Sequence, residues 1–181
     1  MNVVSQIKEK ARAKHRRVVL PEGTEPRMIQ ATGKLLTEGI ASVTLLGDRK
    51  DIERLGKEHH VDLGKAELID PVQSPDYKSF VSEFMEIRKA KGITEADAKK
   101  AMASPLFFGA MLVRHDRADA SVSGSVNTTG DVLRAAIQVI GLKQGITTVS
   151  SSFIMTIPKF RDTTDKVFMF GDCAVIPNPT V

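Results

Sequence analysis

The sequence predicts an α/β protein in which a parallel β-sheet is covered by helices on both faces. Short apolar runs of strand length alternate with longer segments whose apolar residues recur every three or four positions. Only a few residues connect one segment to the next, which is typical of βαβ units. Hydrophobic residues make up 41% of the 181 positions, enough for a substantial core. Sheets of this class bind ligands beyond the carboxyl ends of their strands.

The elements can be assigned in order from their apolar spacing and their boundary residues. Pro26 at the first position of a helix and Gly39 just past its end are typical helix signals. Thr94 and Asp97 resemble a capping box that opens a short helix. The expected helices span residues 2–14, 26–38, 49–58, 75–91, 94–103, 105–115 and 130–140, and the expected strands span residues 17–22, 42–46, 66–69 and 118–124.

The pattern changes after Gly145. Two strand-like segments, 147–157 and 166–170, are separated by only eight residues. A parallel crossover needs about a dozen residues or more, so these segments are expected to form an antiparallel pair. We therefore expect an N-terminal α/β domain over residues 1–145 and the beginning of a second α/β domain over residues 146–181.

Charge and cysteine content bear on compartment and partners. The net charge of +4 arises from 26 basic and 22 acidic residues that are interspersed, so no nucleic-acid partner is expected. The densest basic run, residues 8–17, lies on an amphipathic helix and is interpreted as its solvated face. The lone Cys173 excludes an intrachain disulfide and indicates a reducing compartment. No apolar run reaches the roughly 18 residues of a membrane span, and no signal peptide is evident, so a cytoplasmic protein is expected.

The segment SGSVNTTGDVLR, residues 123–134, is the strongest candidate for a binding site. A strand ends near its start, and a helix is expected to begin near Gly130, which places Arg134 in the first turn. Positive charge is unfavourable there by about 0.3–1 kcal/mol, unless an anion lies beside it. Backbone N–H groups at a helix N-terminus, together with a guanidinium, suit an oxyanion such as phosphate. The other candidate phosphate-binding residues are Gly124, Asn127, Thr128 and Thr129.

Two alternatives stay open for the candidate arginines. The segment also fits an ordinary strand–turn–helix in which Thr129 caps the helix and Arg134 points into water. Arg88 extends an apolar stripe formed by Tyr77, Val81 and Phe84. It could lean into an anion site, or its stem could pack while its head reaches solvent.

Metal chemistry is not indicated by the sequence. The histidines form no pair at helical spacing and no cluster with cysteine, so no metal site is expected. The four are His15, His59, His60 and His115.

The sequence closely resembles the N-terminal part of the phosphate acetyltransferases, also called phosphotransacetylases. The resemblance runs in order along essentially the whole chain. The stretches that carry it are VLPEGTEPR (residues 19–27), EIRKAKG (86–92), PLFFG (105–109), ADASVSGSVNTTGDVLR (118–134) and FGDCAVIPNPT (170–180).

The resemblance implies a fold like that of isocitrate and isopropylmalate dehydrogenases, with two α/β domains and an active site in the cleft between them. It implies reversible conversion of acetyl-CoA and phosphate to acetyl phosphate and CoA by a homodimer, without a metal or organic cofactor. Arg88 and Arg134 match the two active-site arginines in the N-terminal half of family members. Thr128 falls where the family has a serine or threonine hydroxyl near the phosphate.

Family chains are nearly twice as long, and the resemblance places their catalytic aspartate in the C-terminal half. No base is therefore assigned in these 181 residues, which are expected to be an N-terminal fragment, inactive by itself. Two alternatives remain for the function. One is a phosphate butyryltransferase, and the other is a noncatalytic domain that senses acetyl-CoA within a larger enzyme.

Overall fold

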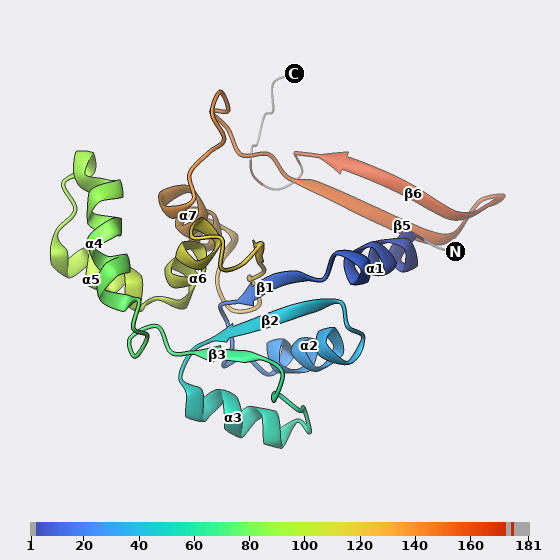
Figure 1. Ribbon diagram of the computed structural model, residues 1–181. Helices are drawn as coiled ribbons and strands as arrows, with labels where there is room; N and C mark the ends of the chain where they lie inside the picture. The colour runs from blue at the N-terminus through green and yellow to red at the C-terminus, as the bar shows by residue number, and fades with distance from the viewer. Residues whose placement is uncertain (1–2, 173–174, 176–181) are drawn as a thin grey trace. The chain divides into compact units, whose positions relative to one another are not determined.

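The computed structural model describes residues 3–172 and 175, and its contacts divide the chain into two compact units (Figure 1). One unit is Ala11–Gly141, and the other joins the first ten residues to the segment after Gly141. The assignment of domains to residues 1–145 and 146–181 stays a prediction.

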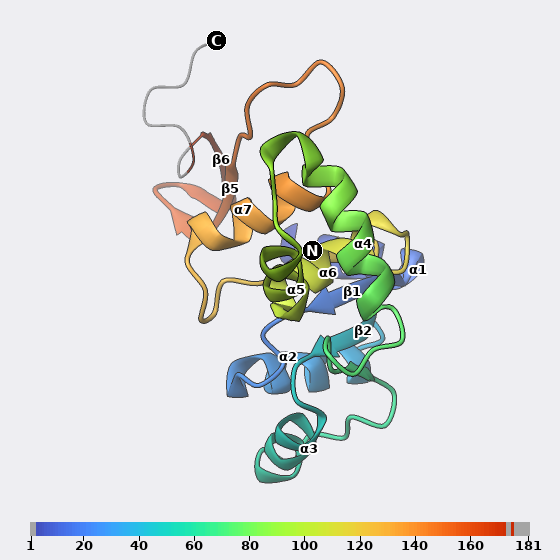
Figure 2. The same cartoon turned by 90° about the vertical axis from the view of Figure 1, so that its left-hand side faces the viewer.

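A four-stranded parallel sheet lies at the centre of the Ala11–Gly141 unit, which confirms the predicted fold class. Its strands follow the order β3-β2-β1-β4, and each neighbouring pair is parallel. Strands β3, β2 and β1 can be followed in this order in Figure 1, and Figure 2 shows β1 and β2 from another side. The strands are β1 (Arg16–Leu20), β2 (Ala41–Leu46), β3 (Glu67–Ile69) and β4 (Ala120–Ser121).

Helices cover both faces of this sheet. Helices α2 (Pro26–Thr37) and α3 (Arg49–Glu58) pack on one face, and α4 (Tyr77–Arg88), α5 (Glu95–Ala103), α6 (Pro105–Arg114) and α7 (Thr129–Val139) pack on the other. Helix α1 (Val3–Lys14) precedes β1 along the chain and has no buried residue. Pro26 occupies the first turn of α2, as expected from its missing N–H group. The hydroxyl oxygen of Thr94 accepts from the backbone N–H of Asp97 at 3.2 Å, so the predicted cap of α5 is confirmed.

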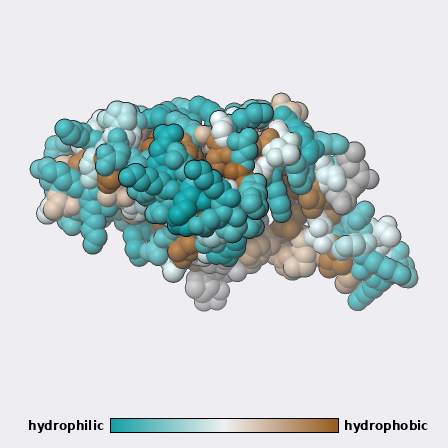
Figure 3. All heavy atoms as spheres, turned by 90° about the horizontal axis from the view of Figure 1, so that it is seen from below, coloured by the Kyte–Doolittle hydropathy of each residue, from teal (hydrophilic) through white to brown (hydrophobic). Residues whose placement is uncertain are grey.

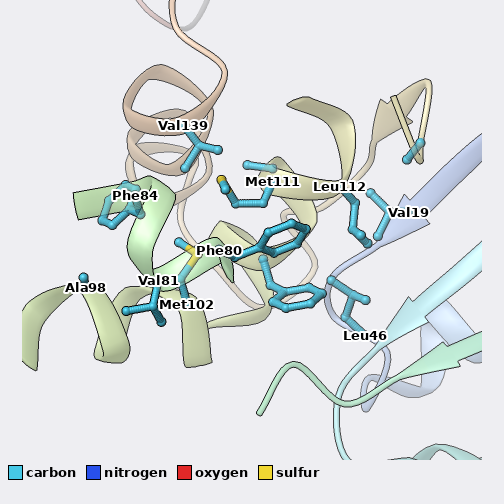
Figure 4. Close-up of a cluster of buried hydrophobic side chains, with 13 residues drawn as sticks. Val19, Leu46, Phe80, Val81, Phe84, Ala98, Met102, Met111, Leu112 and Val139 are labelled. Atoms are coloured by element: carbon cyan, nitrogen blue, oxygen red, sulfur yellow. The ribbon is translucent and has the colours of Figure 1, made fainter. Parts of the chain in front are cut away.

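Alternation along the strands divides the core into two clusters, because successive side chains point to opposite faces. Val19 and Leu46 belong to a cluster formed with α4, α5, α6 and α7 (Figure 4). Leu20 and Leu45 belong to a second cluster, formed with α2 and α3. Both clusters consist of fully or nearly fully buried side chains, as expected for a parallel sheet covered on both faces.

The antiparallel pairing predicted after Gly145 is confirmed, but the strands differ from the expected ranges. Strand β5 (Ser152–Phe160) pairs with β6 (Thr163–Gly171), so two residues connect them instead of eight. The register skips Pro158 and Asp165, where proline has no N–H to donate and Asp165 has a φ of 51°. The hairpin therefore continues past the proline that was expected to end its first strand.

Two other segments also differ from the expected ranges. The helix expected over 75–91 is α4 followed by a 3₁₀ turn over Lys89–Lys91. The strand expected over 118–124 pairs only at Ala120–Ser121; the N–H of Val122 still donates to the backbone oxygen of Val19, and the N–H groups of residues 124–127 donate to the side chain of Glu22.

The molecular surface is largely hydrophilic on the face drawn in Figure 3. Within the described part of the chain, no helix combines the length and the apolar character needed to cross a bilayer.

Candidate functional site

The loop after β4 wraps around a carboxylate of the protein itself. Glu22, which follows β1, is 6% exposed, and its oxygens accept four successive backbone N–H groups. Gly124 and Ser125 donate to Oε2 at 2.9 and 2.7 Å, and Val126 and Asn127 donate to Oε1 at 3.0 and 2.8 Å. The side-chain Nδ2 of Asn127 adds a fifth hydrogen bond to Oε1 at 2.8 Å. The backbone N–H groups of residues 124–127 therefore bind a carboxylate of the protein itself.

Burial and hydrogen bonding act in opposite directions on Glu22. Desolvation raises its pKa, but the hydrogen bonds from Asn127, Val126 and Ser125 outweigh this and lower the pKa to about 2. The carboxylate is therefore ionised at neutral pH. It stays so inside the fold because backbone dipoles take the place of water.

Two glycines shape the backbone on either side of this contact. The N–H of Gly23 donates to the backbone oxygen of Leu46 at 3.0 Å, and a Cβ at position 23 would lie 2.6 Å from that oxygen. Gly124 has a φ of 113°, which L side chains rarely adopt. Glycine is therefore favoured at position 23 by the close backbone of β2 and at position 124 by the backbone conformation.

This contact lies where the strand order reverses. Strands β2 and β3 lie on one side of β1, and β4, the next strand along the chain, lies on the other side of β1. Residues that follow β1 and β4 therefore flank the topological switch point, the usual ligand site of open α/β sheets. A cavity of about 360 Å³ opens there, lined by Pro21, Glu22, Thr24, Glu25, Ser104, Pro105, Leu106, Val126 and Asn127.

The start of α7 differs from the prediction. Thr128, and not Thr129, is the N-cap, because the Thr128 hydroxyl oxygen accepts from the N–H of Asp131 at 3.2 Å. The helix consequently begins at Thr129, and Arg134 is its sixth residue, in the second turn. Its position therefore does not require an external anion to offset the helix dipole.

Thr128 and Arg134 share one carboxylate. The Thr128 hydroxyl donates to Oδ2 of Asp131 at 2.7 Å, and Nη1 of Arg134 donates to Oδ1 at 3.1 Å. Hydrogen bonding from Thr128, followed by the charge of Arg134, lowers the pKa of Asp131. Both the hydroxyl and the guanidinium can therefore be directed at one anionic group on the exposed side of α7.

Arg88 lies elsewhere in the same unit. It ends α4, its side chain is half-buried, and it has no hydrogen bond or ion pair with any residue in the described ranges. Helices α4 and α7 are joined through Arg114, which donates to Glu83 at 2.8 Å and to the backbone oxygen of Val139 at 3.0 Å. The structure thus links the two helices, but no shared partner connects Arg88 to Arg134. Their convergence on one ligand stays a prediction.

The remaining predicted residues separate into two groups. The N–H groups of Gly124 and Asn127 already donate to Glu22, and Thr129 is the exposed first residue of α7. Their roles as direct phosphate ligands stay predictions. Cys173 lies outside the described residues.

Glu22 is the residue that the sequence analysis missed. Its signal was an acidic residue at the end of the strand expected over 17–22, in the stretch VLPEGTEPR. Arg27, from the same stretch, donates to the backbone oxygen of Ser125 at 2.8 Å. Two of the stretches that carry the family resemblance therefore bind each other.

Metal binding has no support in the described ranges. Within 3–172 and 175, no group of three or more histidine, cysteine, aspartate or glutamate side chains could hold an ion.

Comparisons with known proteins agree with this architecture. The family model described as "Phosphate acetyl/butaryl transferase" matches residues 2–181. A phosphate acetyltransferase of Thermoanaerobacterium thermosaccharolyticum is 41% identical over 99% of this chain and 54% of its own length. One from Clostridium acetobutylicum is 38% identical with the same coverage. The chain thus spans about half the length of these curated relatives.

Solved structures are similar along the same region. A phosphotransacetylase from Streptococcus pyogenes has a TM-score of 0.87 and 31% identity, covering 99% of this chain and 54% of that one. The EutD phosphotransacetylase from Staphylococcus aureus has a TM-score of 0.83 and 32% identity, covering 97% and 51%. By sequence and by fold, the chain belongs to the phosphate acetyl/butaryl transferase family.

Proposed function

We propose that the protein carrying this chain transfers acetyl groups reversibly between CoA and inorganic phosphate. The substrates are acetyl-CoA and phosphate in one direction, and acetyl phosphate and CoA in the other. The curated relatives named phosphate acetyltransferase support the acetyl group over butyryl. Because the chain spans about half of their length, the activity is proposed for the whole protein.

In the proposed reaction, the CoA thiolate attacks the carbonyl carbon of acetyl phosphate. Phosphate leaves with the electron pair of the C–O bond, so negative charge grows on its oxygens. A guanidinium aimed at those oxygens lowers the barrier, because it stabilises the charge where it develops. The reaction as proposed needs no metal ion and no organic cofactor.

One observation carries the assignment of the phosphate-binding residues. The exposed Thr128 hydroxyl and the Arg134 guanidinium already bind one carboxylate, that of Asp131. The Arg134–Asp131 ion pair is solvent-exposed, with side chains 61% and 41% accessible, and pairs of this kind contribute only about 0–1 kcal/mol. A phosphate dianion can therefore bind Arg134 with little loss of free energy from breaking the Arg134–Asp131 ion pair. We assign Thr128 and Arg134 to the phosphate, with Thr129 beside them.

Arg88 is proposed as the second cation of the site. Its head has no ion-pair partner in the described part of the chain, so binding an anion would not require breaking an existing pair. Gly124 and Asn127 contribute by forming the loop that leads into Thr128.

We also propose a cytoplasmic homodimer that binds no nucleic acid. The single cysteine supports a reducing compartment, and the family resemblance supports the dimer.

The test is a pair of arginine variants in the full-length enzyme. Arg134→Ala and Arg88→Ala should each lower kcat/KM for acetyl phosphate by about 10²–10³-fold, as for a lost charge-stabilising donor, while KM for CoA changes little. The matched control is Arg54→Ala. Arg54 is also exposed on a helix and pairs with the carboxylate three residues earlier, Asp51, at 3.2 Å.

Unchanged kinetics in both active-site variants would reject the assignment. Equal losses in Arg54→Ala would show a nonspecific effect of removing a surface charge and would also reject it. Rates with acetyl-CoA and butyryl-CoA, measured on the wild-type enzyme, decide the acyl group.

A further inference from the structure

The Glu22 carboxylate has no role in the reaction proposed above, yet it is the most densely hydrogen-bonded acid of the site. All five of its hydrogen-bond donors are uncharged N–H groups, at 2.7–3.0 Å. Burying a charge is costly unless hydrogen bonds compensate for it. A buried carboxylate beside a predicted phosphate site also repels the ligand, so its presence needs a compensating function.

The five hydrogen bonds hold the loop in a single conformation. Four consecutive peptide units, at residues 124–127, point their N–H groups at two oxygens of one rigid group. The next residue, Thr128, is the N-cap of α7 and donates to Asp131, the carboxylate that also holds Arg134. The orientation of the Glu22 carboxylate thereby also fixes the position of the first turns of α7.

Glu22 is itself tied to the sheet. Its own backbone oxygen accepts from the N–H of Glu25 at 3.0 Å, and the neighbouring Gly23 is bonded to Leu46 of β2. A second contact holds the loop from the same side, because Arg27 donates to the backbone oxygen of Ser125. The side chains of Glu22 and Arg27 therefore hold the loop after β4 in place relative to β1 and β2. These contacts add to the ladder pairing of β4, which covers only two residues.

We propose that Glu22 is a positioning residue, which fixes the loop 124–127 so that Thr128 and Arg134 are held ready for a phosphate oxyanion. This inference rests on the proposed function. Glu22 does not touch the ligand. It occupies the loop N–H groups, so that the ligand binds at the next residues along the chain.

The direction in which Glu22→Gln changes phosphate binding distinguishes a positioning role from a purely electrostatic one. Glu22→Gln removes a negative charge but keeps size and shape. If charge alone mattered, a phosphate site nearby would bind its anion more tightly after the change. If positioning matters, binding weakens, because the amide nitrogen of glutamine faces loop N–H groups with which it cannot pair.

The experiment measures KM for phosphate and for acetyl-CoA in the full-length enzyme. Glu22→Gln should raise KM for phosphate by about tenfold to a hundredfold, the scale expected when site groups move by about 1 Å. KM for acetyl-CoA should stay within about twofold, since the loop is assigned to the phosphate end. Amide hydrogen exchange at residues 124–127, followed in the 181-residue chain, should become faster in the variant.

Two further variants make the result interpretable. Glu53→Gln neutralises an exposed carboxylate that binds Arg49 on α3, and it should change neither KM. Asn127→Ala removes one of the five hydrogen bonds, and it should raise KM for phosphate in the same direction but less. This variant also serves if Glu22→Gln does not fold, as judged by circular dichroism.

The outcomes separate the two proposals. An unchanged or lowered KM for phosphate in an active Glu22→Gln enzyme would overturn the positioning role alone. So would unchanged exchange at residues 124–127. A wild-type enzyme that transfers no acetyl group would overturn the proposed function, and the role of Glu22 in substrate positioning with it.

Discussion

Asn127 donates two hydrogen bonds to a single oxygen of Glu22, one from its backbone N–H and one from its side-chain amide, each at 2.8 Å. The two residues are 105 positions apart in the chain. They follow the neighbouring strands β4 and β1, so this pair closes the carboxyl edge of the sheet at the switch point.

Asn127→Ala should destabilise the fold through the loss of its side-chain hydrogen bond. A hydrogen bond to a charged group contributes about 1.5–3 kcal/mol, and the buried Oε1 of Glu22 would lose one of its three donors. Urea unfolding should show a loss in this range. The control Gln30→Ala, at an exposed amide on α2, should stay within about 0.5 kcal/mol. Equal losses in the two variants would contradict the prediction.

Acidification should remove the stabilisation contributed by Glu22. Its pKa falls from the ordinary value of 4.5 to about 2 in the folded protein. Because the folded-state pKa is the lower one, the stabilisation is complete above about pH 5 and is lost as the pH falls toward 2. By linkage, its size is about 3 kcal/mol.

The measurement is the difference in unfolding free energy between wild type and Glu22→Gln from pH 6 to pH 2. Other carboxylates titrate in both proteins and cancel in this difference. The difference should shrink as the pH falls. A difference that stays constant over this range would show that Glu22 has an ordinary pKa.

Thr128→Ala should affect both stability and phosphate use. Loss of the N-cap of α7 costs about 0.5–2 kcal/mol, and the hydroxyl assigned to phosphate is lost with it. The control is Thr94→Ala, because Thr94 caps α5 in the same way and donates to Asp97 as Thr128 donates to Asp131. Both variants should lose similar stability in thermal unfolding, but only Thr128→Ala should raise KM for acetyl phosphate.

Thr128→Ser keeps the hydroxyl and should restore both properties. If Thr94→Ala raised KM for acetyl phosphate as much as Thr128→Ala does, the effect would come from lost stability, and the phosphate role of Thr128 would be rejected.

Alanine at two glycines should have opposite effects on stability. At position 23, the new Cβ would lie 2.6 Å from the backbone oxygen of Leu46, and overpacking of this kind costs about 1–3 kcal/mol. At Gly130, inside α7, the nearest atom is the Thr128 hydroxyl oxygen at 3.7 Å, so alanine fits. Helix propensity then predicts a gain of about 0.5–1 kcal/mol. Denaturant midpoints of the two variants should move in opposite directions. An unchanged or higher midpoint for Gly23→Ala would contradict the packing at position 23, and a lower midpoint for Gly130→Ala would contradict the fit of alanine in α7.

Much of the framework could be predicted from local sequence. Pro26, Thr94 and the apolar spacing of 49–58 mark elements through contacts within a few residues, and the structure contains those elements. The ion pair of Asp131 with Arg134 was also accessible, since residues three apart on a helix are neighbours. It was missed because Arg134 was interpreted as facing either an external anion or water.

Other features depended on distant contacts. The pairing of β4 covers two residues, and the N–H groups from residue 124 onward donate to Glu22, more than 100 positions away. The β5–β6 hairpin passes through Pro158, which local rules treat as the end of a strand, because its register leaves that position unpaired.

By itself, the sequence determined the alternation of strands and helices and the cap of α5. These follow from steric and hydrogen-bonding preferences that act over a few residues. Only the tertiary structure decided which anion the loop 124–127 binds, because its backbone N–H groups can donate to any oxyanion of suitable shape. Folding brings the carboxylate of Glu22 there first, and leaves Thr128 and Arg134 exposed beside it.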